Sequence, residues 1–379
     1  MKYGSIIDYV QTELRSFNEH PLSPVDSLVL SQLAYNEIAP LLKALEPSSP
    51  LLLHDTLRAE HFPAMFAGIF EAEKSRALLF ALSASPRFRD LELCRYVSEY
   101  DSAEGKQFSA MCIRIAPDLC YIAFRGTDDS LVGWKEDFSI AFKAPVPSQR
   151  RSAEYFSAVA AREEGSFILG GHSKGGNLAV YAAMSVPPEL QARIVSVYDH
   201  DGPGFKEGVL DNDGYRRIKD RIQKTVPESS LVGMLLDGHD RYSVVGCRRM
   251  GGVMQHDPFT WEVSSGRFHP VDEVTGSAKY INAAMRTWID GLSDYDRERF
   301  IEKLFAILDA GKAETFSEIT REWRKNSAAI FAAMKDADPE MKGYLRQLIG
   351  DFSSILMQSL KSKVLPRRLA GEPLTLDEL

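Results

Sequence analysis

The sequence lacks several features that mark specialised classes of protein. It has only four cysteines among 379 residues, Cys94, Cys112, Cys120 and Cys247, and their spacing matches no metal-binding motif. We therefore expect these cysteines to serve as small, buried, apolar side chains in a protein of a reducing compartment, and we expect no structural zinc site. No apolar run approaches the roughly 18 to 20 residues that cross a bilayer, and the first residues do not have the pattern of a secretory signal. These absences predict a cytoplasmic protein.

Basic charge is also scarce. Lysine and arginine number 45 against 53 aspartates and glutamates, which gives a net charge of −8 and argues against nucleic acid as the main partner. The acidic residues are spread along the chain, as on an ordinary solvated surface. Apolar residues make up 44% of the chain, enough for one large α/β domain with an appendage or for two domains.

The first 85 residues are predicted to be helical. Apolar residues from 25 to 35 recur at helical spacing, with a helix start at Ser23-Pro24, and residues 75–84 show a similar pattern. From residue 90 the period changes to that of strands. Three short segments rich in β-branched and aromatic residues, separated by turn-forming residues, predict consecutive strands joined by hairpins: 91–100, 108–115 and 120–125.

Helices and strands then alternate. Helical patterns cover 134–142 and 150–162, and strand patterns cover 194–198, 222–226 and 242–247. This alternation predicts an α/β fold with a mostly parallel sheet flanked by helices. After about residue 280 only helical periodicity remains, at 295–308, 315–334 and 340–360. We therefore predict two units, residues 1–285 and a helical C-terminal subdomain of residues 286–379.

The most informative segment is residues 166–180. The apolar run 167–169 leads into Gly171-His172-Ser173-Lys174-Gly175, and a small-residue helix pattern follows. A strand, a tight turn with serine at its apex and a helix form the nucleophile elbow of α/β-hydrolases, in which the flanking positions must lack side chains. The helix also directs backbone N–H groups at a developing negative charge. Ser173 is therefore the candidate nucleophile.

A serine nucleophile needs an acid and a base, which follow in the order Ser, acid, His in this fold. The strand at 194–198 ends in Asp199-His200-Asp201-Gly202, and Asp201 at this turn is the candidate acid, with Asp199 as a structural residue. Glu228, Asp237 and Asp240 remain alternatives, because some lipases carry the acid one strand later.

Of the eight histidines, His256 lies in a loop after the last convincing strand, where the fold needs the base. His239 and His269 are the alternatives. His172 is expected to pack sideways within the turn, and His200 lies too close to Asp201 in the sequence to reach it. For the second oxyanion donor, the strand that ends at Phe124 leads into Arg125-Gly126-Thr127, and Thr127 supplies an amide and a hydroxyl.

These motifs resemble class 3 lipases. Residues 122–127, Ile-Ala-Phe-Arg-Gly-Thr, followed by Trp134 and Asp137, are similar to the oxyanion strand and loop of that family, and residues 171–176 are similar to its nucleophile turn. The resemblance covers roughly residues 90–265. It implies that Ser173 is the nucleophile, that Thr127 and the Lys174 amide form the oxyanion hole, and that Arg125 braces the strand ends. Lys174 replaces an apolar residue, so we expect a charge beside the nucleophile.

The whole chain also resembles a poorly characterised bacterial family of lipase-like hydrolases, through the segments 25–28, 171–177, 201–205, 232–235 and 255–259. The expected function is hydrolysis of carboxylic esters by Ser173, His256 and Asp201, with Thr127 and Lys174 holding the oxyanion. No cofactor or metal is expected, and the partner is a small-molecule ester or lipid. Membrane-surface contact and a homodimer are open possibilities for the C-terminal helices. The alternatives are a catalytically silent interaction scaffold and an acyltransferase or thioesterase.

Overall fold

The sheet of this protein has a parallel centre and antiparallel edges. The computed structural model describes residues 3–44, 50–128, 130–140, 143–236, 241–249, 252–293, 295–299 and 302. Within these residues, nine strands form one sheet in the order β1-β2-β3-β4-β5-β6-β7-β8-β11. The parallel centre consists of β4 (Leu119–Phe124), β5 (Ser166–His172), β6 (Ile194–His200), β7 (Ile222–Pro227) and β8 (Ser243–Val245).

Antiparallel strands complete both edges of the sheet. One edge is built from β1 (Leu51–Leu52), β2 (Glu92–Asp101) and β3 (Lys106–Ala116), and β11 (Pro270–Val271) pairs with β8 at the other. The predicted hairpin-linked strands are therefore confirmed as β2, β3 and β4. A separate pair consists of β9 (Val263–Ser264) and β10 (Arg267–Phe268).

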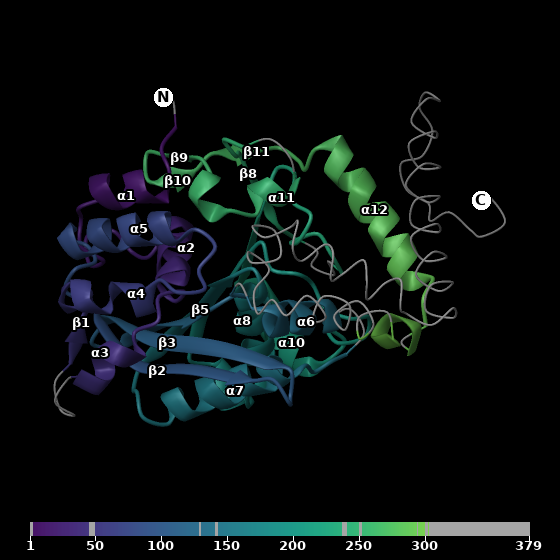
Figure 1. The fold of residues 1–379 in the computed structure, drawn as a ribbon, viewed down its shortest axis with the longest axis horizontal. Coiled ribbons are helices and arrows are strands. Elements are labelled where there is room, and N and C mark those ends of the chain that lie inside the picture. Colours follow the sequence, from purple (N-terminus) through teal and green to yellow (C-terminus); the bar gives the residue numbers. More distant parts are fainter. Residues whose placement is uncertain are drawn as a thin grey trace.

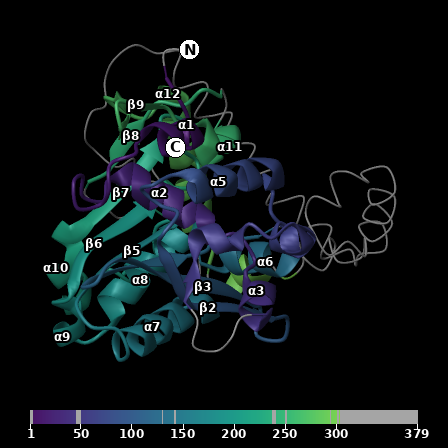
Figure 2. The same ribbon diagram turned by 90° about the vertical axis from the view of Figure 1, so that its left-hand side faces the viewer.

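Helices cover both faces of the sheet (Figures 1 and 2). One face packs against α7 (Pro147–Ala160), α8 (Lys174–Ser185) and α10 (Asp213–Ile218), and the other against α1 (Ile6–Thr12), α2 (Pro24–Leu33) and α5 (Ala72–Ala84). Strand β4 shows how the sequence divides the core. Tyr121 and Ala123 point to the side of α2, whereas Ile122 and Phe124 point to the side of α8, as the two-residue period of a strand requires.

The remaining described helices are short apart from α12. They are α3 (Ala39–Ala44), α4 (Phe62–Met65), α6 (Leu131–Ser139), α9 (Pro188–Gln191), α11 (Gly252–Gln255) and α12 (Gly276–Asp290), with 3₁₀ turns at Leu53–Thr56, Ala59–His61, Lys219–Arg221 and Pro258–Thr260. No helix among the described residues is long and apolar enough to cross a membrane.

The N-terminal helical layer begins as its sequence predicts. Helix α2 starts at Pro24 with Ser23 as its N-cap, and Asp26 completes a capping box. Asp26 is fully buried. It also forms a bidentate ion pair with Arg87, in the turn that follows α5, with N–O distances of 2.7 and 2.8 Å. This contact ties two helices of the layer together.

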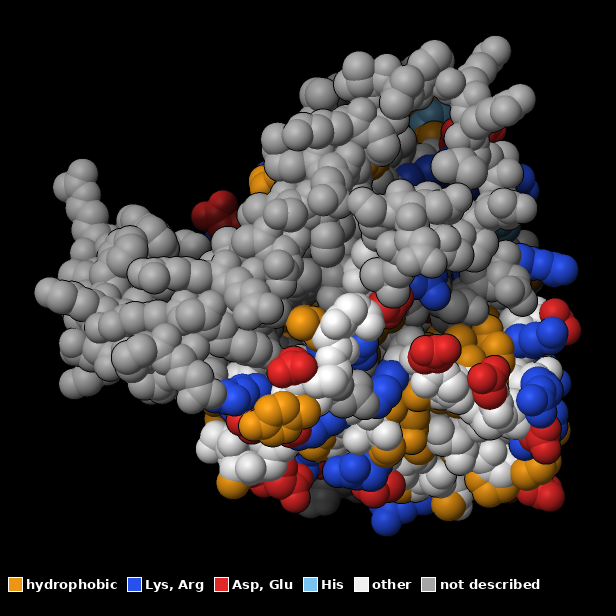
Figure 3. All heavy atoms as spheres, turned by 90° about the vertical axis from the view of Figure 1, so that its right-hand side faces the viewer, with side chains coloured by type: hydrophobic (Ala, Val, Ile, Leu, Met, Phe, Trp, Pro, Cys, Tyr) orange, Lys and Arg blue, Asp and Glu red, His pale blue; other side chains and the backbone are white. Residues whose placement is uncertain are grey.

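The architecture is an α/β-hydrolase-like fold, as predicted from the sequence. The predicted division between residues 285 and 286 falls within α12, which is continuous across it, and most of the segment 286–379 lies outside the described residues. The division into two units therefore stays a prediction. On the described part of the face in Figure 3, acidic and basic side chains are interspersed, without a continuous field of one sign.

Candidate active site

The turn between β5 and α8 holds Ser173 in an unusual backbone conformation. Its φ of 58° and ψ of −135° lie in a region that residues with side chains rarely occupy. The neighbouring glycines make the turn possible. A Cβ on Gly171 would lie 2.2 Å from the carbonyl carbon of Gly175, and one on Gly175 would lie 2.1 Å from the carbonyl oxygen of Phe124. The segment thus has the strained strand–turn–helix geometry that the sequence predicts.

Asp201 and His256 are joined by a hydrogen bond. Asp201 lies at the end of β6 and is fully buried, and its Oδ2 is 2.7 Å from Nδ1 of His256. Its other oxygen accepts hydrogen bonds from the Ser230 hydroxyl at 2.5 Å and from the Gly233 amide at 3.1 Å. A carboxylate oxygen accepts, so Nδ1 of His256 is the donor in this contact, and in the neutral tautomer of the ring Nε2 is the nitrogen that accepts.

His172, the residue before Ser173, holds His256 from the other side. The two imidazole rings lie 4.6 Å apart, and Nε2 of His172 is 2.9 Å from the main-chain oxygen of His256. Burial keeps the pKa of His172 well below its usual value, so the ring is neutral and has one N–H. A carbonyl only accepts, so that N–H is on Nε2, and Nδ1 accepts from the Tyr35 hydroxyl at 3.3 Å.

The alternative residues of the sequence analysis have other partners or lie outside the described residues. Asp199 accepts from the Gly202 amide at 2.8 Å, which braces the turn before Asp201. Glu228 contacts Gln255 at 3.5 Å, and His269 stacks on Tyr3. His200 is buried and bonded to Ser27. The segment with Asp237, His239 and Asp240 is not among the described residues.

The loop after β4 approaches Ser173 closely at Gly126. A Cβ there would lie 3.2 Å from Cβ of Ser173, 2.6 Å from the His172 carbonyl oxygen and 2.1 Å from the Tyr35 hydroxyl. Only glycine fits this position. The next residue, Thr127, is buried, and its hydroxyl donates a hydrogen bond to Asp137 of α6.

Two features of its surroundings act in opposite directions on the pKa of Asp137. Burial raises the pKa of its carboxyl to about 6, although the nearby ammonium of Lys174, 3.7 Å away, acts in the opposite direction. The carboxyl beneath the Thr127 loop therefore changes its charge at mildly acidic pH.

The expectation of a charge beside the nucleophile is wrong for Lys174. Its side chain is fully buried and runs away from the turn, so that Nζ donates to the main-chain oxygen of Gln107 at 3.0 Å and to its side-chain oxygen at 2.7 Å. Nζ also lies 3.2 Å from the carboxylate of Glu136, which is buried too. The long apolar stem allows the ammonium to reach this partner through the interior.

Comparison with known proteins gives a family. The model of the Mbeg1-like family matches residues 82–306, more than half of the chain. The chain belongs to the Mbeg1-like family. The matched segment begins within α5, so Tyr35 and the helices α1 to α4 lie ahead of it.

Solved structures of lipases are similar to this member of the Mbeg1-like family at low identity. The crystal structure of M37 lipase is 16% identical with a TM-score of 0.35, and the similarity covers 56% of this chain and 70% of that one. The native Rhizomucor miehei lipase propeptide complex is also 16% identical, with a TM-score of 0.30 and coverage of 52% and 67%. No curated protein matches the sequence.

Several residues of the site escaped the sequence analysis. Tyr35 is distant in sequence and stands in a helical region without a motif, so nothing in the sequence relates it to His172. Ser230 and Gly233 hold Asp201 from the loop after β7, where the sequence analysis had considered only alternative acids such as Glu228 and a resemblance at 232–235. Among the described residues, no group of three His, Cys, Asp or Glu side chains is placed to hold a metal ion.

Proposed function

We propose that this protein is a serine hydrolase that cleaves carboxylic esters through an acyl-enzyme on Ser173. The observation that carries the proposal is the hydrogen-bonded Asp201–His256 pair, held by His172 beside a serine in a strained turn. This combination supplies a nucleophile, a base with its accepting nitrogen unprotonated and an acid that orients the base.

In the proposed reaction, the Ser173 oxygen forms a bond to the ester carbonyl carbon while its proton passes to Nε2 of His256. The tetrahedral intermediate collapses when the bond to the alcohol oxygen breaks, and His256 returns the proton to the departing alcohol. A water molecule then attacks the acyl-enzyme by the same route and releases the acid. Asp201 stabilises the imidazolium that forms in each half of the reaction.

The oxyanion needs donors on the other side of the nucleophile. The candidates are the main-chain amides of Thr127, in the loop that passes Ser173 at Gly126, and of Lys174, the first residue of α8. Losing one such donor typically lowers kcat by about 10²- to 10³-fold. The buried ammonium of Lys174 takes no part in this role, because it points to Glu136.

A fluorophosphonate probe tests the proposal directly. We expect wild-type protein to be labelled at Ser173 and to hydrolyse p-nitrophenyl esters, whereas Ser173→Ala is neither labelled nor active above background. Ser185→Ala, at the exposed end of α8, is the matched control and keeps both properties. Folded wild-type protein that is not labelled would favour the interaction scaffold instead.

The related acyl-transfer reactions use the same nucleophile, so they need a separate measurement. Acyl-thioesters and alcohol acceptors supplied beside short and long p-nitrophenyl esters distinguish thioesterase and acyltransferase activity from ester hydrolysis. The ester or lipid is the proposed small-molecule partner. Contact with a membrane surface and a homodimer, through the helices that the sequence predicts after residue 295, are proposed as further partners.

A further inference from the structure

Three of the four cysteines lie on neighbouring strands at one side of the sheet. Cys94 is on β2, Cys112 on β3 and Cys120 on β4, and all three are free thiols. Their side chains pack into one core cluster, between the sheet and the helices α7 and α8. The proposed hydrolysis uses none of them, so these thiols are open to a second kind of chemistry.

Cys94 and Cys112 are direct partners in the antiparallel pairing of β2 and β3. Residues opposite each other in such a pair point to the same face of the sheet, with Cα atoms about 4.5 or 5.5 Å apart. A disulfide joins residues whose Cα atoms are about 4.4 to 6.8 Å apart. A bulge directly after Cys94, where Arg95 has a φ of 52°, allows β2 to bend locally. The backbone therefore suits a disulfide between these two residues.

Cys120 does not have this geometry. In the pairing of β3 and β4, Cys112 lies opposite Ile122 and Cys120 lies opposite Arg114, so the two cysteines are diagonal neighbours. Diagonal residues are about 7 to 8 Å apart, whereas cysteines whose Cα atoms are more than about 7 Å apart cannot be bridged without movement of the backbone. Of its two neighbours, Cys94 is therefore the one that Cys112 can bridge in the folded protein.

The three thiols differ in their access to solvent. Cys112 and Cys120 are 0% and 1% exposed, whereas Cys94 is only partly buried. The neighbouring thiols of Cys120 and Cys94, together with burial, raise the pKa of the Cys112 thiol. Because the thiolate is the reactive form, Cys112 is the less reactive member of the pair. A small oxidant from solvent therefore meets Cys94 first.

We propose that Cys94 and Cys112 are a site of reversible oxidation, at which a hydroperoxide converts the two thiols into a disulfide that clamps β2 to β3. With hydrogen peroxide, the Cys94 sulfur bonds to one oxygen, the O–O bond breaks, and the departing hydroxide takes the thiol proton and leaves as water. The Cys112 sulfur then bonds to the Cys94 sulfur, the S–O bond of the sulfenic acid breaks, and a second water leaves with the Cys112 proton. Two thiols are oxidised to one disulfide, and the peroxide is reduced to two waters.

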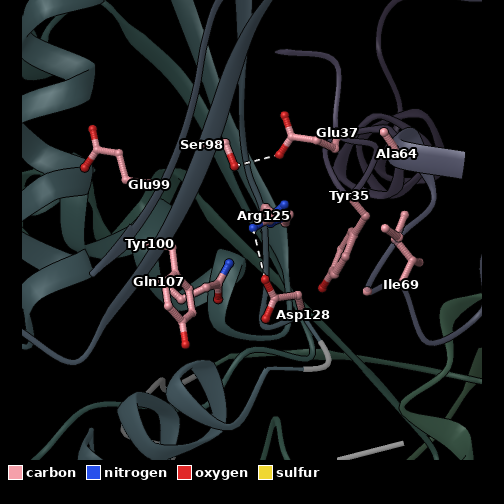
Figure 4. A pocket seen from close by; sticks show the side chains of 12 residues that line it. Tyr35, Glu37, Ala64, Ile69, Ser98, Glu99, Tyr100, Gln107, Arg125 and Asp128 are labelled. Carbon is pink, nitrogen blue, oxygen red and sulfur yellow. Dashed lines mark hydrogen bonds and ion pairs between the residues drawn. The ribbon is translucent and has the colours of Figure 1, made fainter. Parts of the chain in front are cut away.

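The disulfide would close a loop of the chain that forms one wall of a pocket of about 240 Å³ (Figure 4). Four residues between the two cysteines in the sequence line this pocket: Ser98, Glu99, Tyr100 and Gln107. Gln107 also accepts a hydrogen bond from Lys174, the residue after Ser173. The cross-link would therefore restrain strands that reach the candidate active site, and it would stabilise the fold because it restricts the unfolded chain.

Trypsin places each of the three thiols in its own peptide, so mass spectrometry distinguishes the possible cross-links. Cys94 falls in residues 90–95, Cys112 in 107–114 and Cys120 in 115–125. The reduced full-length protein is treated with hydrogen peroxide, its remaining thiols are blocked with iodoacetamide, and it is digested without reductant. We expect a product that joins 90–95 to 107–114 and that disappears when the oxidised protein is treated with dithiothreitol.

Two variants check the assignment. Cys94→Ala should abolish the cross-link, whereas Cys120→Ala, the matched control on the neighbouring strand, should keep it. A wild-type product that joins 107–114 to 115–125, a cross-link only between two molecules, or no cross-link at all contradicts the proposal. Iodoacetamide added to the folded, reduced protein gives an independent measurement. Cys94 should be alkylated several-fold faster than Cys112, and equal or slower alkylation of Cys94 would exclude it as the first thiol to react.

Urea unfolding of the oxidised and the reduced protein tests the clamp. The oxidised wild type should unfold at a higher urea concentration than the reduced wild type, and the difference should be absent in Cys94→Ala treated in the same way. Equal midpoints in the wild type would show that the cross-link does not clamp the hairpin. None of these measurements requires ester hydrolysis, so their outcome is independent of the proposed function.

Discussion

His172 shows how a residue without a catalytic role of its own is expected to control the candidate base. Its Nε2–H donates to the main-chain oxygen of His256, and because a carbonyl only accepts, this contact determines which ring nitrogen carries the proton, while the Tyr35 hydroxyl lies at Nδ1. Burial keeps this ring neutral, so in the proposed reaction no second imidazolium opposes the one that forms on His256. His172 is thus a positioning residue.

Replacement of His172 by phenylalanine should lower kcat and leave KM nearly unchanged. The main-chain oxygen of His256 would lose its donor, at a cost of about 1 to 3 kcal/mol, which corresponds to roughly 5- to 150-fold in rate if it appears in the transition state. His172→Gln restores a donor at the position of Nε2 and should recover most of kcat. Steady-state kinetics with one p-nitrophenyl ester measures both values. A phenylalanine variant with wild-type kcat would show that the contact has no role in positioning.

The contact between Tyr35 and His172 could not be predicted from the sequence. Ser173, Asp201 and His256 were selected because each stands in a recognisable turn at the end of a strand, and the structure brings Asp201 and His256 together. Tyr35 lies 137 positions before His172 and carries no motif. Contacts of this kind depend on which helix covers the sheet, and periodicity contains no information about that.

At the scale of elements, a buried ion pair fastens the start of α8 to α6 and β3. Lys174 and Glu136 are both inaccessible, and Gln107 at the start of β3 completes the cluster. Removing one partner of a buried pair leaves an uncompensated charge, which typically costs about 3 to 5 kcal/mol. The removal of both partners costs less, because no charge is left behind.

Lys174→Met should therefore destabilise the protein by about 3 to 5 kcal/mol, and Glu136→Gln in the same chain should recover a large part of the loss. Urea unfolding of the wild type, the two single variants and the double variant measures the coupling free energy between Lys174 and Glu136. Arg216→Met breaks an exposed pair with Asp213 and, as the control, should cost less than about 1 kcal/mol. A loss in the double variant equal to the sum of the two single losses would mean that the pair is not coupled.

Element types were predictable and their packing was not. The strands from β2 to β8 follow the predicted segments within a few residues because their apolar, β-branched runs have no other stable burial. Lys174 illustrates the failure at the same scale. A charge next to a turn is expected to face solvent, and only the tertiary position of Glu136 and Gln107 explains why this one points inward.

At the scale of the whole molecule, the N-terminal helices form one of the two layers over the sheet and also reach the site. Helix α2 packs on β4, β5 and β6, and Ser27 on this helix bonds both Tyr121 of β4 and His200 of β6. These polar contacts are buried between layers. They tie the segment that precedes the family match to β4, which leads into the Thr127 loop, and to β6, which leads into Asp201.

That buried layer makes the stability of the fold depend on pH. Burial lowers the pKa of His200 to about 3 and that of His172 well below its usual value of about 6.5. Both rings bind protons in the unfolded chain and not in the folded one. Their contribution to the free energy of unfolding is therefore present above pH 6.5 and is lost as the pH falls. Asp137 has the opposite sign, because burial raises its pKa to about 6, and its contribution is lost as the pH rises from 4 to 6.

Between pH 4 and 6 the two histidines therefore outweigh Asp137 by one proton, and the free energy of unfolding should fall by about 1.4 kcal/mol for each pH unit of acidification from these groups. His200→Gln should lower the measured slope by that amount, since one histidine and Asp137 then cancel. Asp137→Asn should raise it by the same amount, since two histidines then act without opposition. Urea unfolding at half-unit pH intervals measures the three slopes. A His200→Gln slope equal to that of the wild type would show that the imidazole of His200 is charged within the folded protein.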